Sequence, residues 1–435
     1  VGVLETGQVS AGGGDAGFVF DGGILRLTGN QSSLFTGFAP GEVILAAGGG
    51  MIDTQHYDVA TAFGLSGAGA LAKAGTGMLT LTGTNTHGGG TLVLDGTLTL
   101  TGANTYGGGT IVWGGALRVD GGSIAHAAED MMLGYDAGNN AALVIENGGK
   151  VTNKDAYIGL WANSMGTVNV IGGHSEWVSD RVYVGINGTG ALSIENGGAV
   201  SSSLEIQIGA GYGTGTVTVT GPDSSLNTDD LQVGYNGTGT LTVEEGGTVT
   251  SRRATIGHAS GSSGIATITG ADSAWTLIAD LTVGRLGTGA LTIANGGTVS
   301  STLGYIGDLS GSTGTVTVTG ASSTWTNSDN FFVGYMGTGI VTVADGGAMS
   351  SGNAYVGFSG TGTLNVENGG TVASADEVSI GYANTGTMSV SGGGTVSGVA
   401  GFIGRFAGST GTVTVTGANS EWANSGDLAV GYVGS

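Results

Sequence analysis

Cysteine is absent from the 435 residues of this chain, and proline occurs only twice. A secreted chain of this length often uses cysteines as disulfides, so their complete absence needs an explanation. The scarcity of proline and the lack of a strict Gly-X-Y period exclude a collagen triple helix, although 94 residues are glycine. Disorder also fits poorly, because apolar residues make up 39% of the chain and fall in short patches of Val, Ile and Leu.

Basic residues are scarce as well. Lys and Arg total 10 against 32 Asp and Glu, which gives a formal net charge of -22. Nucleic-acid binding requires a basic stripe, and anionic membrane surfaces repel an acidic chain. No apolar run approaches the roughly 20 residues of a membrane-spanning helix. We therefore expect no nucleic-acid partner and no membrane insertion by this part of the protein.

What the chain does contain is a repeat. The segment VGYNGTGTLTVEEGGTVTS begins at Val233, and VGYMGTGIVTVADGGAMSS begins at Val333. The glycine that follows the repeated Val, Ile or Leu, called here the landmark glycine, recurs at intervals of about 25 residues from Gly134 to Gly431. A period of this length indicates a solenoid or another repeat architecture.

Within one repeat, apolar and polar residues alternate, which is the spacing of a β-strand. In GTLTVEEGGTV, Leu241 and Val243 fall on one face and Thr240 and Thr242 on the other. Each repeat offers about three such patches, separated by glycine-rich corners such as Asn-Gly-Gly. Three short strands and three corners in about 25 residues predict one rung of an all-β parallel β-helix.

A second pattern lies upstream. The motif Asn-Thr-His/Tyr-Gly-Gly-Gly-Thr occurs at Asn85 and again at Asn104. It resembles the passenger-associated repeat of Gram-negative type V autotransporters, and the units from about Leu133 onward resemble the Gly/Thr/Val repeats of autotransporter adhesins. The resemblance implies a right-handed β-helix, a location at the bacterial cell surface or outside the cell, and a C-terminal translocator barrel in the full-length protein. The absence of cysteine fits export as an unfolded chain.

These patterns predict three segments. Residues 1–65 are expected to form N-terminal β-helix rungs or a cap, and residues 66–120 the passenger-associated repeats. Residues 121–435 are expected to form rungs of about 25 residues that pair into 50-residue double repeats. The chain stops inside a repeat, so we expect it to be a piece of a longer protein.

Catalysis finds little support in the sequence. A glycoside hydrolase needs two carboxylates that face each other across a bond. Adjacent acids such as Asp229 and Asp230 are expected to point to opposite faces of a strand, and Glu146, Glu195, Glu244 and Glu367 repeat at a corner. The five histidines show no metal-ligand spacing. We therefore predict no enzyme activity, no catalytic residues, no metal site and no cofactor.

Two sets of aromatic residues are candidate surface contacts. Tryptophan recurs in a Ser-x-Trp position, where it either fills a wider rung, the favoured interpretation, or forms an exposed strip for glycan or protein contact. Tyrosine follows several landmark glycines and is expected to point outward at a corner. The candidates are Trp177, Trp275, Trp325, Trp422, Tyr135, Tyr235, Tyr335, Tyr382 and Tyr432.

The leading functional hypothesis is a non-catalytic adhesin. Its partner would be a host surface, a matrix protein or a glycan, bound through many weak contacts. The first alternative is a passenger that associates with other copies of itself in aggregation or biofilms. The second is a polysaccharide-active β-helix enzyme, which a groove lined by acids from adjacent rungs would favour.

Overall fold

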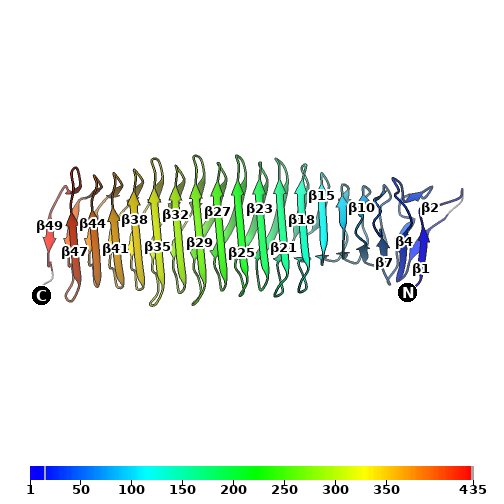
Figure 1. Cartoon of the computed structure of the whole chain (residues 1–435), viewed down its shortest axis with the longest axis horizontal. Helices are drawn as coiled ribbons and strands as arrows, with labels where there is room; N and C mark the ends of the chain where they lie inside the picture. Colours follow the sequence, from blue (N-terminus) through cyan, green and yellow to red (C-terminus); the bar gives the residue numbers. More distant parts are fainter. Residues whose placement is uncertain (14–15, 433–435) are drawn as a thin grey trace. The chain divides into compact units, whose positions relative to one another are not determined.

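The computed structural model describes residues 1–13 and 16–432, and no helix occurs among them. Strands joined by tight corners make up two compact units, Val1–Leu204 and Glu205–Ser435. Within each unit every strand runs parallel to its equivalents in the preceding and following turns (Figure 1). The predicted fold, an all-β right-handed parallel β-helix with about three strands per rung, is confirmed. The described residues therefore include no helix that could cross a membrane.

In the unit Glu205–Ser435, the first strand of each turn joins one ladder. In-register pairing sets Thr313 opposite both Thr288 and Thr338, so equivalent positions of the repeat stack on each other. This ladder contains β25 (Thr214–Thr220), β27 (Thr238–Glu244), β29 (Ser263–Thr269), β32 (Thr288–Ala294), β35 (Thr313–Thr319), β38 (Thr338–Ala344), β41 (Thr361–Val366), β44 (Thr385–Val390) and β47 (Thr410–Val415).

The second and third strands of each turn form two more ladders. In the first turns of the unit they are fused into single long strands, β26 (Ser225–Val233) and β28 (Thr248–Ile256). The second ladder continues through β30 (Ala274–Leu277), β33 (Thr298–Ser301), β36 (Thr324–Asn327), β39 (Ala348–Ser351), β42 (Thr371–Ser374), β45 (Thr395–Gly398) and β48 (Glu421–Asn424). The third continues through β31 (Leu281–Val283), β34 (Gly304–Ile306), β37 (Phe331–Val333), β40 (Ala354–Val356), β43 (Glu377–Ile380), β46 (Ala400–Ile403) and β49 (Leu428–Val430).

The core is a column of Val, Ile and Leu inside the turns. In β35, Val316 and Val318 are fully buried, whereas the threonines between them are half-buried on the outer face. Each such fully buried side chain contributes about 1.5–3 kcal/mol relative to an exposed one. The alternation in the sequence therefore places the apolar residues inside the coil and the polar residues on its outer face.

The corners depend on residues that accept a positive φ. Asn295 and Gly296, in the Asn-Gly-Gly corner after β32, have φ values of 53° and 91°. Asn and Gly adopt this left-handed conformation at low cost. The landmark glycine of the same turn, Gly284, has φ 74°, and a Cβ there would lie 2.3 Å from the carbonyl oxygen of Thr313. This close approach between turns, together with the positive φ, explains the glycine at landmark positions such as Gly234, Gly284 and Gly334, whereas at Gly404 and Gly431 only the positive φ applies.

The unit Val1–Leu204 is built on the same plan. Its first strand of each turn lies in β8 (Val59–Thr61), β10 (Met78–Leu81), β12 (Thr97–Leu100), β15 (Gly115–Asp120), β18 (Asn140–Glu146), β21 (Met165–Ile171) and β23 (Thr189–Glu195). Its other ladders include β1 (Val3–Thr6), β4 (Gly23–Leu27), β7 (Gly50–Asp53), β9 (Leu71–Ala74), β11 (Thr91–Val93), β14 (Thr110–Val112), β16 (Ser123–His126), β17 (Met131–Leu133), β19 (Lys150–Asn153), β20 (Asp155–Ile158) and β22 (Glu176–Val184).

The Asn-Thr-His/Tyr-Gly-Gly-Gly-Thr motif lies in short turns of this unit, and its polar residues point inward. Asn85 and Asn104 are buried, 19 residues apart, and the Asn85 amide donates to Asn104 Oδ1 at 2.6 Å. His87 and Tyr106 are also buried and stack with their ring centroids 5.0 Å apart. Within each copy the ring also bonds to the last threonine of the motif, His87 to Thr91 at 3.2 Å and Tyr106 to Thr110 at 2.6 Å, so the repeated polar residues are partnered both within a turn and between turns.

Candidate functional site

The outer face of the third ladder carries side chains that do not repeat. Elsewhere the outward positions are mostly uniform; in β25 and β35, for example, they are all threonine. On the third ladder, by contrast, outward positions carry acids, arginines, glutamine, histidine and aromatic rings. Two rows of this face, both within Glu205–Ser435, form the candidate site.

The strand row contains the residue two positions before each landmark glycine from Gly234 to Gly357, in register from one strand to the next. The corner row contains the residue directly after each landmark glycine from Gly234 to Gly431. The strand row is Gln232, Thr255, Thr282, Tyr305, Phe332 and Tyr355, and the corner row is Tyr235, His258, Arg285, Asp308, Tyr335, Phe358, Tyr382, Arg405 and Tyr432.

A cavity of about 630 Å³ opens on this face where the polar parts of both rows meet, and we call it the polar cleft. Its lining comes from successive turns of the coil and contains acidic, basic, amide, hydroxyl and phenol groups. The lining residues are Asp230, Gln232, Arg253, Ala254, Thr255, His258, Asp280, Thr282, Arg285, Tyr305, Asp308 and Tyr335.

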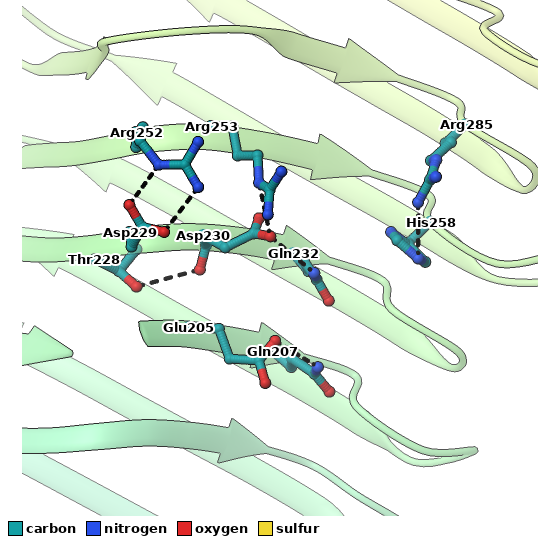
Figure 2. Close-up of polar contacts among 10 residues, drawn as sticks. All are labelled: Glu205, Gln207, Thr228, Asp229, Asp230, Gln232, Arg252, Arg253, His258 and Arg285. Carbon is teal, nitrogen blue, oxygen red and sulfur yellow. Dashed lines mark hydrogen bonds and ion pairs between the residues drawn. The ribbon is translucent and has the colours of Figure 1, made fainter. Parts of the chain in front are cut away.

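One wall of the polar cleft is fixed by an ion pair between neighbouring turns. Arg253 Nε lies 3.1 Å from Asp230 Oδ2, and the Gln232 amide donates to the same carboxylate at 3.3 Å (Figure 2). Just outside the cleft, Arg252 makes two hydrogen bonds to Asp229, at 2.6 and 2.9 Å. Asp229 and Asp230 both bond to arginines of the next turn. The sequence predicts that these two neighbours point to opposite faces of the strand, but the strand pairing leaves Asp229 out, and the alternation is interrupted there.

The opposite wall carries Arg285, an exposed arginine. Among the described residues it has no carboxylate within ion-pair distance, and its Nη1 donates to His258 Nε2 at 3.2 Å. Because a guanidinium can only donate, His258 Nε2 must be the acceptor and its proton sits on Nδ1. Burial, and then the Arg285 charge, lower the pKa of His258, so its ring is neutral at pH 7.

Two further carboxyl groups face the cleft. Burial raises the pKa of Asp280, and the nearby charge of Arg253 opposes the shift. Burial likewise raises the pKa of Asp308, against the charge of Arg285. Both groups also act on Tyr305, whose pKa is raised by burial and then by these neighbouring charges. Besides the Arg253–Asp230 ion pair, the cleft thus contains two further acids, a neutral imidazole and a guanidinium without a carboxylate partner.

At one end of the cleft the face becomes aromatic. The aromatic ladder consists of Tyr305 and Tyr335, which line the cleft, and of Phe332, Tyr355, Phe358 and Tyr382 beyond it. In the strand row, Tyr305 stacks on Phe332 at 5.2 Å and Phe332 on Tyr355 at 5.3 Å. In the corner row, Phe358 stacks on Tyr335 at 5.1 Å and on Tyr382 at 4.6 Å.

The two rows of rings also meet edge to face. Phe332, for example, meets Tyr335 with an interplanar angle of 75° and Phe358 with one of 81°. Such offset and edge-to-face pairs contribute about 0.5–1.5 kcal/mol each beyond their area burial. The ladder is therefore a rigid surface in which the inner rings cover one another's faces.

The ladder ends at a cationic residue. The Arg405 guanidinium lies 4.3 Å from the Phe402 ring centroid and 5.1 Å from that of Tyr382. Arg405 also pairs with Glu377. Burial, and then the charge of Glu377, raise the pKa of Tyr355 to about 12. Tyr355 is consequently a neutral phenol across the physiological range.

The tyrosines predicted as outward contacts lie as follows. Tyr335 and Tyr382 belong to the aromatic ladder, and Tyr235 lies against His258 with ring centroids 4.7 Å apart. In the other unit, Tyr135 is half-buried against Trp113, at 5.6 Å. Tyr432 is 63% exposed and meets Phe402 edge to face. All five are at least partly accessible, and their role in binding stays a prediction.

The tryptophan candidates require a correction. Trp177, Trp275 and Trp325 are fully buried, so they cannot form the exposed strip that was the second interpretation of their spacing. Each indole fills the interior, and its N–H donates to a buried polar group: Asn153 Oδ1 at 2.7 Å, Ser251 Oγ at 3.1 Å and Ser301 Oγ at 3.1 Å, respectively. Trp422 lies half-buried in β48.

Several residues of the site were not identified from the sequence. Unlike the predicted tyrosine contacts, which follow the landmark glycine, these residues precede it: Gln232, Asp280, Tyr305, Phe332 and Tyr355. The available signal was the variability of the position two residues before each landmark glycine, which alternation places on the outer face. Aligning the rungs on that glycine would have separated this variable column from the threonine columns.

Comparison with known proteins gives three findings. The family model described as the passenger-associated transport repeat matches residues 71–98 and 95–119. Among solved structures, the chain is similar to a TibC-catalysed hyper-glycosylated TibA fragment, with 15% identity and a TM-score of 0.43 over 97% of this chain and 100% of that one. No curated protein matches the chain.

Proposed function

We propose that this chain, which its passenger-associated transport repeats identify as an autotransporter passenger domain, is a non-catalytic adhesin. It acts at the bacterial cell surface or after release from it. Its partner is a host surface, a matrix protein or a glycan, bound through the outer face of the third ladder in Glu205–Ser435.

One observation carries this proposal: the outer face of the third ladder departs from the repeat, whereas the first ladder retains it. Outward residues of the first ladder are dominated by threonine, a residue that strand propensity alone favours. The third ladder instead exposes arginine, aspartate, histidine and aromatic groups over many consecutive turns. Exposed non-uniform side chains on a rigid scaffold are typical of a binding surface.

The lack of cysteine offers a direct test with a matched control. Thr282 lies in the strand row, and Thr292 is a half-buried outward threonine of the first ladder. We expect a polyethylene glycol chain attached to Thr282→Cys to block adhesion to immobilised matrix proteins, glycans or host cells, and the same chain on Thr292→Cys to leave it intact. Equal effects of the two adducts, or no adhesion by the unmodified chain, would contradict the proposal.

Self-association remains the first alternative. Sedimentation velocity over a range of concentrations separates it from adhesion, because only self-association produces larger species in the absence of another partner. If the Thr282→Cys adduct abolished the larger species and the unmodified chain bound no host ligand, the outer face of the third ladder would bind other copies of this chain.

The polysaccharide-active enzyme is a second alternative with its own observation. Asp230, Asp280 and Asp308 line one cleft and come from different turns of the coil. Asp230 is already engaged by Arg253 and Gln232, which leaves Asp280 and Asp308 as the acids that could flank a glycosidic bond. If the chain released reducing ends from a polysaccharide, and if Asp280→Asn and Asp308→Asn each abolished this release, the chain would be a hydrolase and not an adhesin.

A further inference from the structure

The polar cleft contains hydrogen-bonding capacity that no described residue uses. The Gln232 residue is only 7% exposed, and its Oε1 has no partner among the described residues. The Nδ1 of His258, which carries the ring proton, also has none in that part of the chain. A buried polar atom without a partner costs about 1–3 kcal/mol, so each one is a place where a ligand group gains binding energy.

The unused capacity is mixed. Gln232 Oε1 is an acceptor, His258 Nδ1 and the Arg285 guanidinium are donors, and Asp280 and Asp308 accept hydrogen bonds when ionised. An anion can only accept hydrogen bonds and would face these two carboxyl groups in a chain of net charge -22. A cation would face Arg253 and Arg285. A hydroxyl both donates and accepts, so the lining matches a neutral ligand that is rich in hydroxyl groups.

An aromatic platform adjoins these polar groups. The aromatic ladder begins at Tyr305, whose ring stacks on Phe332 on one side. On the other side its partner in the preceding strand is Thr282, which carries no ring. In the same way, Tyr335 stacks on Phe358, and the corner residue of the preceding turn is Asp308. Tyr305 and Tyr335 meet each other edge to face, with ring centroids 5.2 Å apart, and neither has a stacked ring on the side of the preceding turn.

A free ring face beside convergent polar groups fits the two sides of a sugar. The C–H face of a pyranose packs against the electron-rich face of an aromatic ring, and its hydroxyls point to the sides. The cavity of about 630 Å³ falls in the range of about 300–1,000 Å³ that small-molecule sites occupy. We infer that the polar cleft is the binding site for a neutral oligosaccharide, which stacks on Tyr305 and Tyr335 and hydrogen-bonds with Gln232, His258, Asp280 and Arg285. This inference rests on the proposed adhesin function and names its ligand class.

The test uses the whole chain and an array that contains neutral oligosaccharides and their uronate- and sialate-bearing counterparts. We expect binding to the neutral members, with affinity that changes little as salt is raised, because no net charge is neutralised. Arg285→Ala, at an exposed position, and Tyr305→Thr, which copies the residue of the preceding turn, should each weaken binding about tenfold. Tyr305→Phe keeps the ring and should retain most of the affinity.

The matched control is Tyr382→Thr, which removes a ring of the same ladder that does not line the cleft and should leave the affinity unchanged. Circular dichroism establishes that each variant is folded. Binding only to the acidic sugars with a steep loss in salt, or equal losses in Tyr305→Thr and Tyr382→Thr, would overturn the inference. If the chain still adhered to host cells or matrix proteins while neutral oligosaccharides neither bound nor competed, the inference would fail and the adhesin proposal would stand. A chain that adhered to nothing would remove both.

Discussion

Residues 71–119 place their unusual side chains inside the coil, whereas the unit Glu205–Ser435 places its own on the outer face. In the first region the distinctive residues Lys73, His87 and Tyr106 are buried. In the second, the distinctive residues of the polar cleft and the aromatic ladder lie on the outer face, and the interior is mostly aliphatic. An unusual residue in a β-helix therefore has no fixed meaning until its side of the coil is known.

The two regions also differ in how their unusual residues are repeated. In residues 71–119 several buried polar groups recur at the pitch of the turn and bond to each other, as Asn85 does to Asn104. Thr110, for example, is bonded to Tyr106 at 2.6 Å and to His126 at 3.1 Å. In Glu205–Ser435 the outward residues of the third ladder change from turn to turn. Repetition in register supports stability, whereas variation on a rigid outer face is free to encode recognition.

The largest expected effect compares one substitution in both regions. Tyr106→Ala removes a buried ring and two stacking partners, and we expect a loss of about 3–5 kcal/mol in the free energy of local unfolding. Tyr335→Ala removes a half-buried ring whose main loss is its ring contacts, about 1–2 kcal/mol. Hydrogen exchange of peptides around each site measures both values. Equal losses would break the comparison, and Tyr106→Phe, which keeps the ring, serves as the control.

The next effect is an acid response that we expect to be larger in the first region, because in the second region the lowered pKa of His258 is opposed by the raised pKa values of Asp280 and Asp308. Burial lowers the pKa of His87 from 6.5 to about 4. Between pH 6.5 and pH 4 the imidazole is therefore protonated in the unfolded chain and neutral in the folded chain. The contribution of neutral His87 to the free energy of unfolding is fully present above pH 6.5 and is lost as the pH falls toward 4. The loss amounts to about 3 kcal/mol. Asp280 and Asp308 have the opposite sign, because their raised pKa values make the fold relatively more stable in acid.

Hydrogen exchange at pH 7 and pH 4.5, corrected for intrinsic exchange rates, checks this difference. Peptides from residues 71–119 should lose protection in acid, and His87→Tyr, which copies Tyr106 of the next turn, should remove that loss. A wild-type chain whose two regions lost protection equally would contradict the assignment of the acid response to His87.

The smallest effect concerns basic residues. Lys73 is buried, and its ammonium donates to the carbonyl oxygens of Ala74, Gly75 and Asp95. Lys73→Met leaves these acceptors without their donor and should cost about 1–3 kcal/mol. Arg252→Met removes an exposed pair with Asp229 and should not measurably shift the urea midpoint. The comparison would be refuted if the order of these two effects were reversed.

Much of the fold could be predicted because one short pattern dictates it. The Thr-x-Thr alternation predicted strands such as β35, and Asn295 with its following glycines predicted a corner. The motif at Asn85 and Asn104 predicted the passenger-associated repeats. The candidate site was predicted less well, because Tyr335 and Tyr382 were identified but the strand row beside them was not.

The sequence by itself determined the winding of this protein. Alternation sends Val316 and Val318 inward, the left-handed corners favour glycine and residues such as Asn295, and the pitch of the repeat brings equivalent residues into register. Only the tertiary structure decided which unusual residues are accessible. Trp325 and Tyr335 are only ten positions apart, yet one is buried and the other lies on the outer face. The physical reason is that neighbours on this face come from turns 23 to 27 residues apart, so the cleft and the aromatic ladder exist only once those turns are stacked.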